Sequence, residues 1–122
     1  MTMLSDAYNI VIDNASWADA VYAKELKQDN IAPNQTFVLV KDSLQAMSLF
    51  GSNTFKEITY DVEIQIWYST NSSLDYDDVE IKLMKALENS GWRTQSIRGR
   101  VPDPDTQQDF QTIYVSKTKE IN

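Results

Sequence analysis

The sequence predicts an α+β fold, with an antiparallel four- to five-stranded sheet and two helices packed on one face. Residues 55–69 alternate apolar and polar side chains, which is typical of a long strand with one buried face. Residues 75–90 carry apolar side chains at helical spacing, which predicts an amphipathic helix. The expected order of elements is helix, strands, helix, strands. Because strands and helices do not alternate regularly, a doubly wound parallel sheet is not expected.

The N-terminal part contains one clear element, a short helix at residues 4–14. Its apolar residues recur at helical spacing, and Ser5 or Asp6 can serve as the N-cap. Residues 17–26 admit two interpretations, a continuation of the helix or a turn followed by a short edge strand. Residues 27–35 are polar, contain a proline and predict a loop.

Residues 36–42 predict a central strand, because apolar side chains fall on both of its faces. Residues 43–54 then predict a connecting loop of unusual length, and long loops are often functional. This loop carries apolar side chains that have no obvious place in a small core. They are Leu44, Met47, Leu49 and Phe50.

The strand predicted at residues 55–69 has two chemically distinct faces. One face is apolar and is expected to lie against the helices. Strand alternation turns the polar side chains to the opposite side, and these include Glu57, Asp61 and Glu63. The alternation continues for longer than the core of a domain of this size requires.

The helix predicted at residues 75–90 has a start signal and a stop signal. Ser73 or Asp75 can cap its first turn, where the helix dipole favours the aspartates that follow. Gly91 is the expected stop. Residues 92–100 then predict a further strand.

Composition narrows the possible functions. The chain has 122 residues and a formal charge of −7, and it contains neither cysteine nor histidine. This length predicts a single domain over residues 1–122. Without thiols or imidazoles, any enzyme would depend on carboxylates, Lys, Arg or Tyr. The acidic balance disfavours specific nucleic-acid binding, and the lack of a long apolar run or N-terminal signal predicts a soluble protein made in a cytoplasm, with no membrane partner.

Residues 101–115 place two prolines and three aspartates before the last predicted strand, at 110–117. Asp103, Asp105 and Asp109 have the offsets that begin a calcium loop. An EF-hand also needs Gly at its sixth position and Glu at its twelfth, where this chain has Gln and Tyr. Each proline holds its predecessor extended, and Asp side chains close turns on nearby amides. We therefore interpret the segment as a stiff turn feeding an edge or interface strand, and expect no metal.

A pair of carboxylates for glycoside chemistry is a weaker interpretation. Its candidates include Glu57, Asp61 and Glu63 on the long strand, together with aspartates at the start of the second helix. The polar face of an amphipathic strand is ordinarily a solvated surface. We favour that interpretation and expect no catalytic residues.

The last predicted strand carries more apolar side chains than one buried face needs, among them Phe110 and Tyr114. Surplus apolar surface on a small domain usually marks a partner. We therefore expect Phe110 and Tyr114 to contact a neighbouring subunit or another protein. The apolar residues of the 43–54 loop admit two interpretations, the same kind of contact or a short turn of helix that covers this subunit's own sheet.

Nearly the whole chain resembles the tail-terminator (tail-completion) proteins of long non-contractile-tailed phages that infect Gram-positive bacteria. The resemblance runs through "TFVLV", a long loop, "YDVEIQIWYS", a helix ending "ALENSGW", and "DPDTQQDFQTIYVSK". Its most specific parts are "QIWY", "SGW" and "DPDTQQ". These patterns describe shape and contain no catalytic signature.

The resemblance implies a structural virion protein at the head-proximal end of the tail, assembled in the host cytoplasm. The protein would form a homo-hexameric ring that caps the tail tube, ends its polymerisation and offers a docking face to the head–tail connector. It implies no enzyme activity and no cofactor. In such a ring, Glu57, Asp61 and Glu63 are expected to face the lumen, where negative walls would let DNA pass without binding.

Other classes of protein remain open from the sequence. Head-closure and head–tail joining neck proteins have similar sizes and architectures. An acidic inhibitor that mimics DNA is compatible with the net charge, although the carboxylates do not form a phosphate-like ladder. An enzyme based on carboxylates is the remaining alternative.

Overall fold

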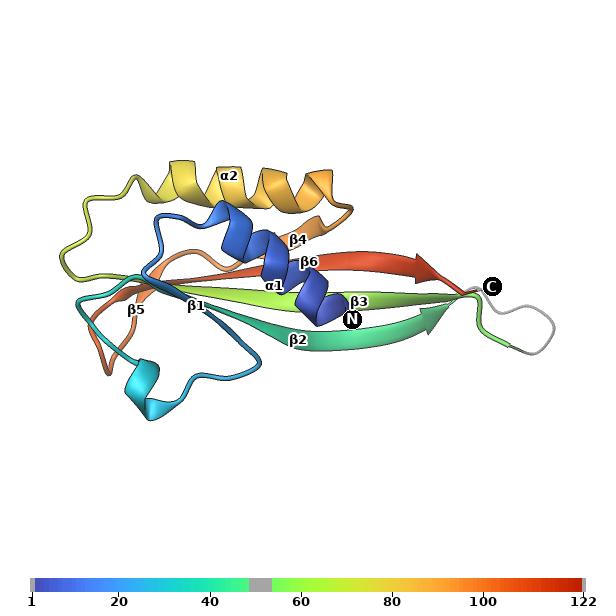
Figure 1. The fold of residues 1–122 in the computed structure, drawn as a ribbon, viewed down its shortest axis with the longest axis horizontal. Helices are drawn as coiled ribbons and strands as arrows, with labels where there is room; N and C mark the ends of the chain where they lie inside the picture. Colours follow the sequence, from blue (N-terminus) through green and yellow to red (C-terminus); the bar gives the residue numbers. More distant parts are fainter. Residues whose placement is uncertain (1, 49–53, 122) are drawn as a thin grey trace.

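The computed structural model describes residues 2–48 and 54–121, and it shows a mixed sheet with two helices over one face (Figure 1). The elements, in chain order, are α1 Met3–Asn14, β1 Ala20–Ala23, the short 3₁₀ helix η1 Gln28–Asn30, β2 Phe37–Ser48, β3 Glu57–Tyr68, α2 Tyr76–Asn89, β4 Arg93–Ile97, β5 Val101–Pro102 and β6 Asp109–Glu120. The α+β class and the two helices on one face are therefore confirmed. Neither helix of the described part is long and apolar enough to cross a membrane.

The sheet differs from the prediction in strand number and in direction. It has six strands in the order β1-β2-β3-β6-β4, with β5 also paired to β6, and β1 runs parallel to β2. For residues 17–26, the correct interpretation is the turn followed by an edge strand. The chain leaves β1, passes through η1 and returns to the same end of the sheet before β2 begins, so the two strands point the same way.

The core lies between the helices and the covered face of the sheet. Alternation along β3 is confirmed, because every second residue from Val62 to Tyr68 is buried. The side chains that fill this layer come from both helices, from β2, β3 and β6, and from Trp92 between α2 and β4. They include Ala7, Val11, Val38, Val40, Val62, Ile64, Ile66, Leu83, Leu87, Trp92, Ile113 and Val115. At about 25 cal/mol per Å² of apolar surface, this layer is the main source of stability.

Helix α1 begins slightly earlier than predicted and uses a different cap. Thr2 is the N-cap, and its hydroxyl accepts a hydrogen bond from the Ser5 N–H at 3.0 Å. The Ser5 hydroxyl in turn accepts from the Thr2 N–H at 3.1 Å, which completes a capping box. Two donors at the helix start are thereby satisfied.

Helix α2 starts and stops where the sequence predicts. The side chain of Asp75 accepts from the Asp78 N–H at 3.2 Å as N-cap. At the other end, the Gly91 N–H donates to the Glu88 carbonyl and the Trp92 N–H donates to the Leu87 carbonyl. This pair of bonds is a Schellman motif, which requires the positive φ of +91° that Gly91 adopts.

Strands β2, β3 and β6 extend past the helices as a three-stranded projection (Figure 1). We call this projection the arm and define it as residues 41–48 of β2, 57–61 of β3 and 117–120 of β6. The predictions of a loop or a short helical turn at 43–54 are therefore both wrong for residues 43–48, which continue β2. A register shift between Asp42 and Leu44 marks a β-bulge at the base of the arm.

The last strand is also placed differently from the prediction. Of the two expectations for residues 110–117, an edge or an interface strand, the edge position is wrong for residues 113–116, because β6 lies there between β3 and β4. The apolar side chains on both faces of β6 are explained by this inner position, because side chains on each face of the strand are buried or half-buried there. Ile113 and Val115 pack in the core under the helices, while Phe110 and Tyr114 lie on the other face of the strand.

Candidate assembly surfaces

The sheet face opposite the helices, called the open face below, carries an aromatic row at one end. Phe37 and Trp67 stack with ring centroids 4.9 Å apart, and Trp67 meets Phe110 at 4.7 Å. Tyr22 extends the row by an edge contact with Phe37. The predicted interface residue Phe110 is thus half-buried within its own subunit.

Residues 101–108 hold this end of the open face in shape. The Trp67 indole N–H donates to one carboxylate oxygen of Asp103 at 3.0 Å. The other oxygen accepts from the backbone N–H groups of Asp105 and Thr106 at 2.8 and 3.3 Å. Gln108 is fully buried and donates to the Gln35 carbonyl at 2.8 Å. The interpretation of this segment as a stiff turn is therefore confirmed.

The carboxyl group of Asp103 has a lowered pKa. Burial acts to raise this pKa, but the hydrogen bonds from the N–H groups of Asp105, Trp67 and Thr106 together outweigh it. All three donors favour the ionised form. Asp103 therefore acts as a fixed anionic acceptor at the centre of the turn.

The three predicted lumen residues do share the open face of β3. Asp61 lies at the edge of a shallow hollow whose lining includes Arg98 and Tyr114. Glu63 has a side chain only 13% exposed, and it forms an ion pair with Lys41 at 3.7 Å. Glu63 also accepts a hydrogen bond from the Gln65 amide. This part of the face is therefore mixed in charge, with the Arg98 guanidinium 5.6 Å from the Tyr114 ring centroid.

The predicted interface residues fall into separate places. Leu44 and Met47 lie on the arm, with 59% and 58% of their surfaces exposed. They point to opposite faces, because Leu44 pairs with Asp61 on the open face and Met47 pairs with Ile58 on the other. Leu49 and Phe50 lie outside the described residues. Phe110 and Tyr114 lie on the open face, where Phe110 packs against Trp67 and Tyr114 lies beside Arg98.

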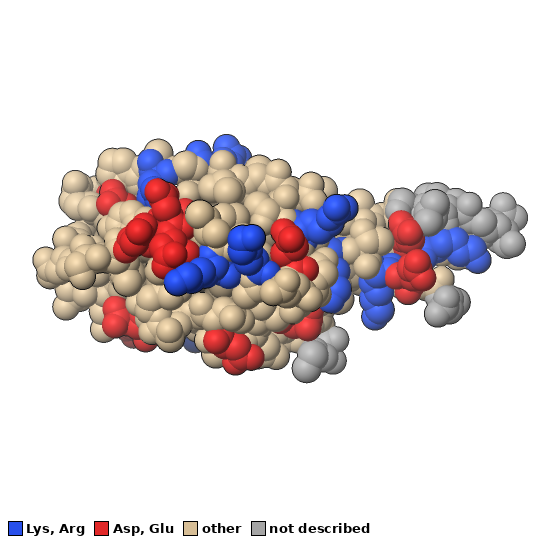
Figure 2. Space-filling view, turned by 90° about the horizontal axis from the view of Figure 1, so that it is seen from above, with Lys and Arg blue, Asp and Glu red and all other residues tan. Residues whose placement is uncertain are grey.

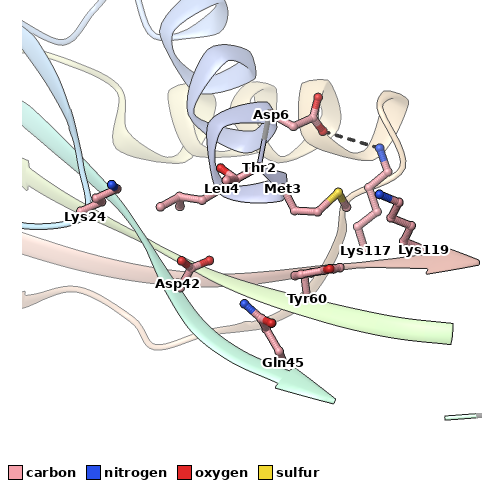
Figure 3. A pocket seen from close by; sticks show the side chains of 10 residues that line it. All are labelled: Thr2, Met3, Leu4, Asp6, Lys24, Asp42, Gln45, Tyr60, Lys117 and Lys119. Carbon is pink, nitrogen blue, oxygen red and sulfur yellow. Dashed lines mark ion pairs between the residues drawn. The ribbon is translucent and has the colours of Figure 1, made fainter. Parts of the chain in front are cut away.

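A hollow of about 650 Å³ lies where the arm leaves the helices, between the start of α1 and the strands (Figure 3). Figure 3 shows Asp42, Gln45 and Tyr60 on its floor and the charged ends of Lys117 and Lys119 at one side. Lys117 forms an ion pair with Asp6 at 3.6 Å. Seen over the helices, acidic and basic side chains are interspersed, and the arm forms the narrow part of the molecule (Figure 2).

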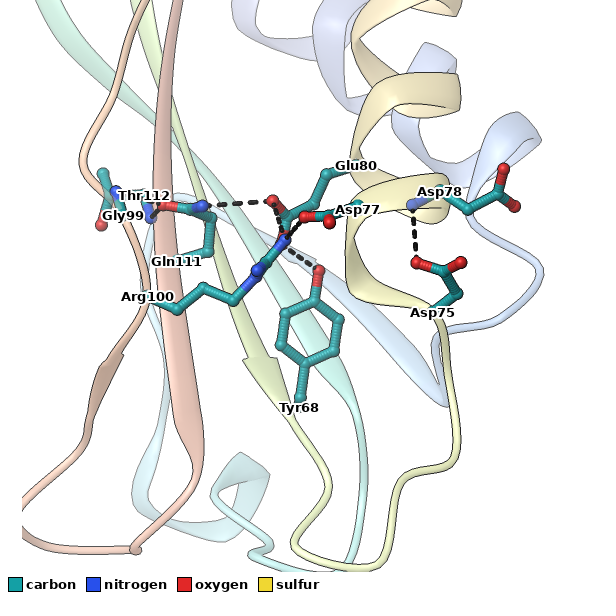
Figure 4. A network of polar contacts seen from close by, with 9 residues as sticks. All are labelled: Tyr68, Asp75, Asp77, Asp78, Glu80, Gly99, Arg100, Gln111 and Thr112. Carbon is teal, nitrogen blue, oxygen red and sulfur yellow. Dashed lines mark hydrogen bonds and ion pairs between the residues drawn. The ribbon is translucent and has the colours of Figure 1, made fainter.

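A buried polar network, which sequence reasoning missed, ties α2 to the sheet (Figure 4). Glu80 is 4% exposed, and its carboxylate accepts from the Tyr68 hydroxyl at 2.5 Å and from Gln111 at 3.1 Å. Arg100 donates to both Glu80 oxygens at 3.0 Å and to Asp77 at 2.7 Å. One sequence signal was available, because Glu80 has the helical spacing of the buried Leu83 and Leu87.

The electrostatics of this network favour a fixed ion pair. The hydrogen bond to Glu80 is the main reason that the pKa of Arg100 is raised. Burial, followed by the bond to Glu80, raises the pKa of Tyr68 well above its usual range. Both groups keep their protons at any physiological pH. The carboxylate of Glu80 is occupied in holding α2 against the sheet.

The sequence profile of a family described as "Protein of unknown function (DUF806)" matches residues 4–120. No curated protein sequence matches the chain. One similar solved structure is the sheath/tube terminator of an extracellular contractile injection system in its extended state, at 13% identity and a TM-score of 0.52. The similarity covers 100% of this chain but only 57% of that one, so this chain spans little more than half of its length.

Proposed function

This chain belongs to the DUF806 family, and we propose that it is a structural virion protein that ends a phage tail tube. In this role, copies of the chain form a ring on the last ring of the tube, stop polymerisation and offer a docking face for the head. The observation that carries the proposal is the fold, which over 100% of this chain matches that of a sheath/tube terminator. The terminator chain is longer than this one, and assigning its role to this chain is part of the proposal.

The distribution of exposed apolar side chains supports assembly into a ring. One lateral side of the sheet carries Leu44 and Met47 on the arm. The opposite side carries Ile97 on β4, which is 47% exposed, and Val101 on β5, which is 55% exposed. Exposed apolar side chains on two opposite edges of the sheet suit a head-to-tail contact, which forms a ring when the rotation between copies closes.

The finer features of the proposal follow the resemblance in the sequence. The ring is a homo-hexamer, and it contacts the tail-tube protein on one side and the head–tail connector on the other. The phage is one with a long non-contractile tail that infects Gram-positive bacteria. The chain acts without enzyme activity or cofactor. The engagement of Glu63, Glu80 and Asp103 in structural contacts supports this last point.

The test adds the purified chain to tail-tube protein while the tubes polymerise. We expect the chain to shorten the tubes in proportion to its concentration, and electron microscopy to show a ring at one end of each tube. Mass measurement in solution should give six times the 14.0 kDa of the chain. Unchanged tube lengths without end rings would refute the proposal. A ring that binds only the head connector would indicate a head-closure or head–tail joining protein instead.

A further inference from the structure

Both edges of the arm present backbone groups that no strand of the described chain covers. On one side, β1 pairs only with residues 37–40 of β2, so residues 41–48 have no strand outside them in the described ranges. On the other side, β4 pairs with residues 113–116 of β6, and residues 117–120 beyond them are likewise uncovered by any described strand. Uncovered edges of this kind are templates for pairing with another chain.

The register identifies which N–H groups of β2 point outward. The Val40 carbonyl accepts from the Lys24 N–H across this outer edge at 2.9 Å, which fixes the direction at Val40. Backbone direction alternates along a strand, and the extra residue at the bulge shifts the alternation by one. Gln45, paired with Tyr60, and Met47, paired with Ile58, therefore direct their N–H groups away from β3.

The same reasoning applies to the outer edge of β6. The Thr112 carbonyl accepts from the Arg98 N–H at 2.9 Å on the β4 side, and alternation gives Ser116 the same outward direction. No register shift interrupts the pairing of β3 with β6, so the next outward residue is Thr118. The side chain of Thr118 is held on the open face by a 2.9 Å hydrogen bond to Thr59.

We propose that the arms of neighbouring copies pair edge to edge, with the β2 edge of one copy joined to the β6 edge of the next. This inference rests on the proposed ring and names the contact that builds it. Strands β2 and β6 both run antiparallel to β3, so they run parallel to each other. A copy related by rotation about the ring axis keeps this direction, so each new junction is a parallel pair. Closure of the ring then leaves no arm edge uncovered.

The charges beside the arm edges favour a second copy of this chain as the partner. They also favour pairing of β2 with β6 over pairing of two β6 edges. Asp42 lies on the outer edge of β2 and is exposed. Lys117 and Lys119 lie on β6 on the same face of the sheet as Asp42, since they pair with residues of β3 that face the helices. Pairing two β6 edges would bring these lysines together. Joining β2 to β6 places acid beside base.

The experiment uses proline to remove one outward N–H from each edge. Gln45→Pro and Thr118→Pro each delete a donor that the subunit's own sheet does not use, so folding should be retained. Gln45→Thr and Thr118→Val, which keep the N–H, are the matched controls. Circular dichroism and thermal unfolding check the fold, and sedimentation measures assembly.

A head-to-tail contact makes a specific prediction for mixtures. Neither proline variant should assemble alone, because every junction in either ring would contain one blocked edge. Mixed in equal amounts, they should form a heterodimer and nothing larger, since only one intact junction is possible between them. The matched controls should assemble as the wild type does.

The outcomes separate this inference from the proposed function. If folded Gln45→Pro and Thr118→Pro still form wild-type rings that cap tubes, the arm pairing is wrong while the proposed function stands. If only one of the two variants fails to assemble, the contact joins like edges and the head-to-tail inference is overturned. A wild-type chain that stays monomeric with and without tube ends would overturn both.

Discussion

Asp103 is the residue on which the shape of the 101–108 segment depends. Its two carboxylate oxygens accept three hydrogen bonds, one of them from the side chain of Trp67 on β3. Its own backbone adds two more bonds, with the N–H donating to Gln108 and the carbonyl accepting from Gln107, both at 2.8 Å. The aspartate thus links a turn to the aromatic row of the open face.

Replacing Asp103 with Asn should lower the free energy of unfolding at pH 7 by about 1–2 kcal/mol, since bonds to a charged acceptor are lost. The pKa of Asp103 is lowered in the folded protein. Its contribution is therefore fully present above the ordinary aspartate pKa of about 3.9 and is lost as pH falls through the folded value. Urea unfolding of both proteins across pH 2–7 measures this. Stability curves that stay separated at the lowest pH would contradict the assignment.

The sequence predicted some single residues and missed others for a physical reason. Asp75 and Gly91 were predictable because a cap and a stop depend on neighbours within a few positions along the chain. The contact of Glu80 with Arg100 joins residues 20 positions apart. The bond from the Trp92 indole to Asp6 spans 86. Such contacts depend on tertiary packing, which local patterns do not record.

At the scale of elements, Gly91 ends α2 and lets Trp92 turn back into the core. Its φ of +91° is strained for any other residue, and a Cβ there would lie 3.2 Å from the Cε of Lys117. Gly91→Ala should therefore destabilise the fold by about 1 kcal/mol from backbone strain alone. Displacement of Lys117, whose amine bonds the Ser90 carbonyl at 2.9 Å, should add to this cost.

Gly99→Ala is the matched control for this prediction. Gly99 has a similar φ of +87°, but nothing lies within 4 Å of the position its Cβ would take. Thermal unfolding should show a smaller loss for Gly99→Ala than for Gly91→Ala. Equal losses would mean that the contact with Lys117 contributes nothing.

One strand segment was predicted wrongly and the direction of another strand was missed, and both depend on neighbouring strands. Residues 43–48 lack the β-branched and aromatic side chains that favour strands, and they extend β2 because β3 and β6 pair alongside. Residues 20–23 were recognised as a possible edge strand, but nothing in four residues reveals that β1 runs parallel to β2. Strand direction is set by the path of the chain between strands.

At the scale of the whole molecule, the layer arrangement was predictable because each layer has its own periodicity. The period of two along β3 and the helical period of α2 each define one apolar face, and two such faces bury each other. The same reasoning does not predict the arm, because no second layer of the described chain covers it. It extends past the helices, and its edges have their proposed partners in other copies.

The proposed ring predicts a role for Glu57, Asp61 and Glu63, which share the open face of β3. If this face lines the lumen, reversing all three to Lys should preserve the ring and make it bind DNA in a salt-dependent way, because basic walls attract phosphates. The formal net charge rises from −7 to about −1, since each reversal adds two charges. Electrophoretic mobility of a DNA probe at several salt concentrations measures binding.

The control must separate the position of the charges from their number. Reversing Asp13 on α1 and Asp78 and Glu88 on α2, all exposed, gives the same net charge on the helices, which cover the other face of the sheet. This control ring should bind DNA much more weakly, because its added lysines lie outside the channel. Reversal of Glu63, whose side chain is only 13% exposed, also replaces its ion pair with Lys41 by two neighbouring cations, so thermal unfolding must first show that the triple variant is folded. A folded triple variant that forms no ring would place these carboxylates between subunits instead of in the lumen.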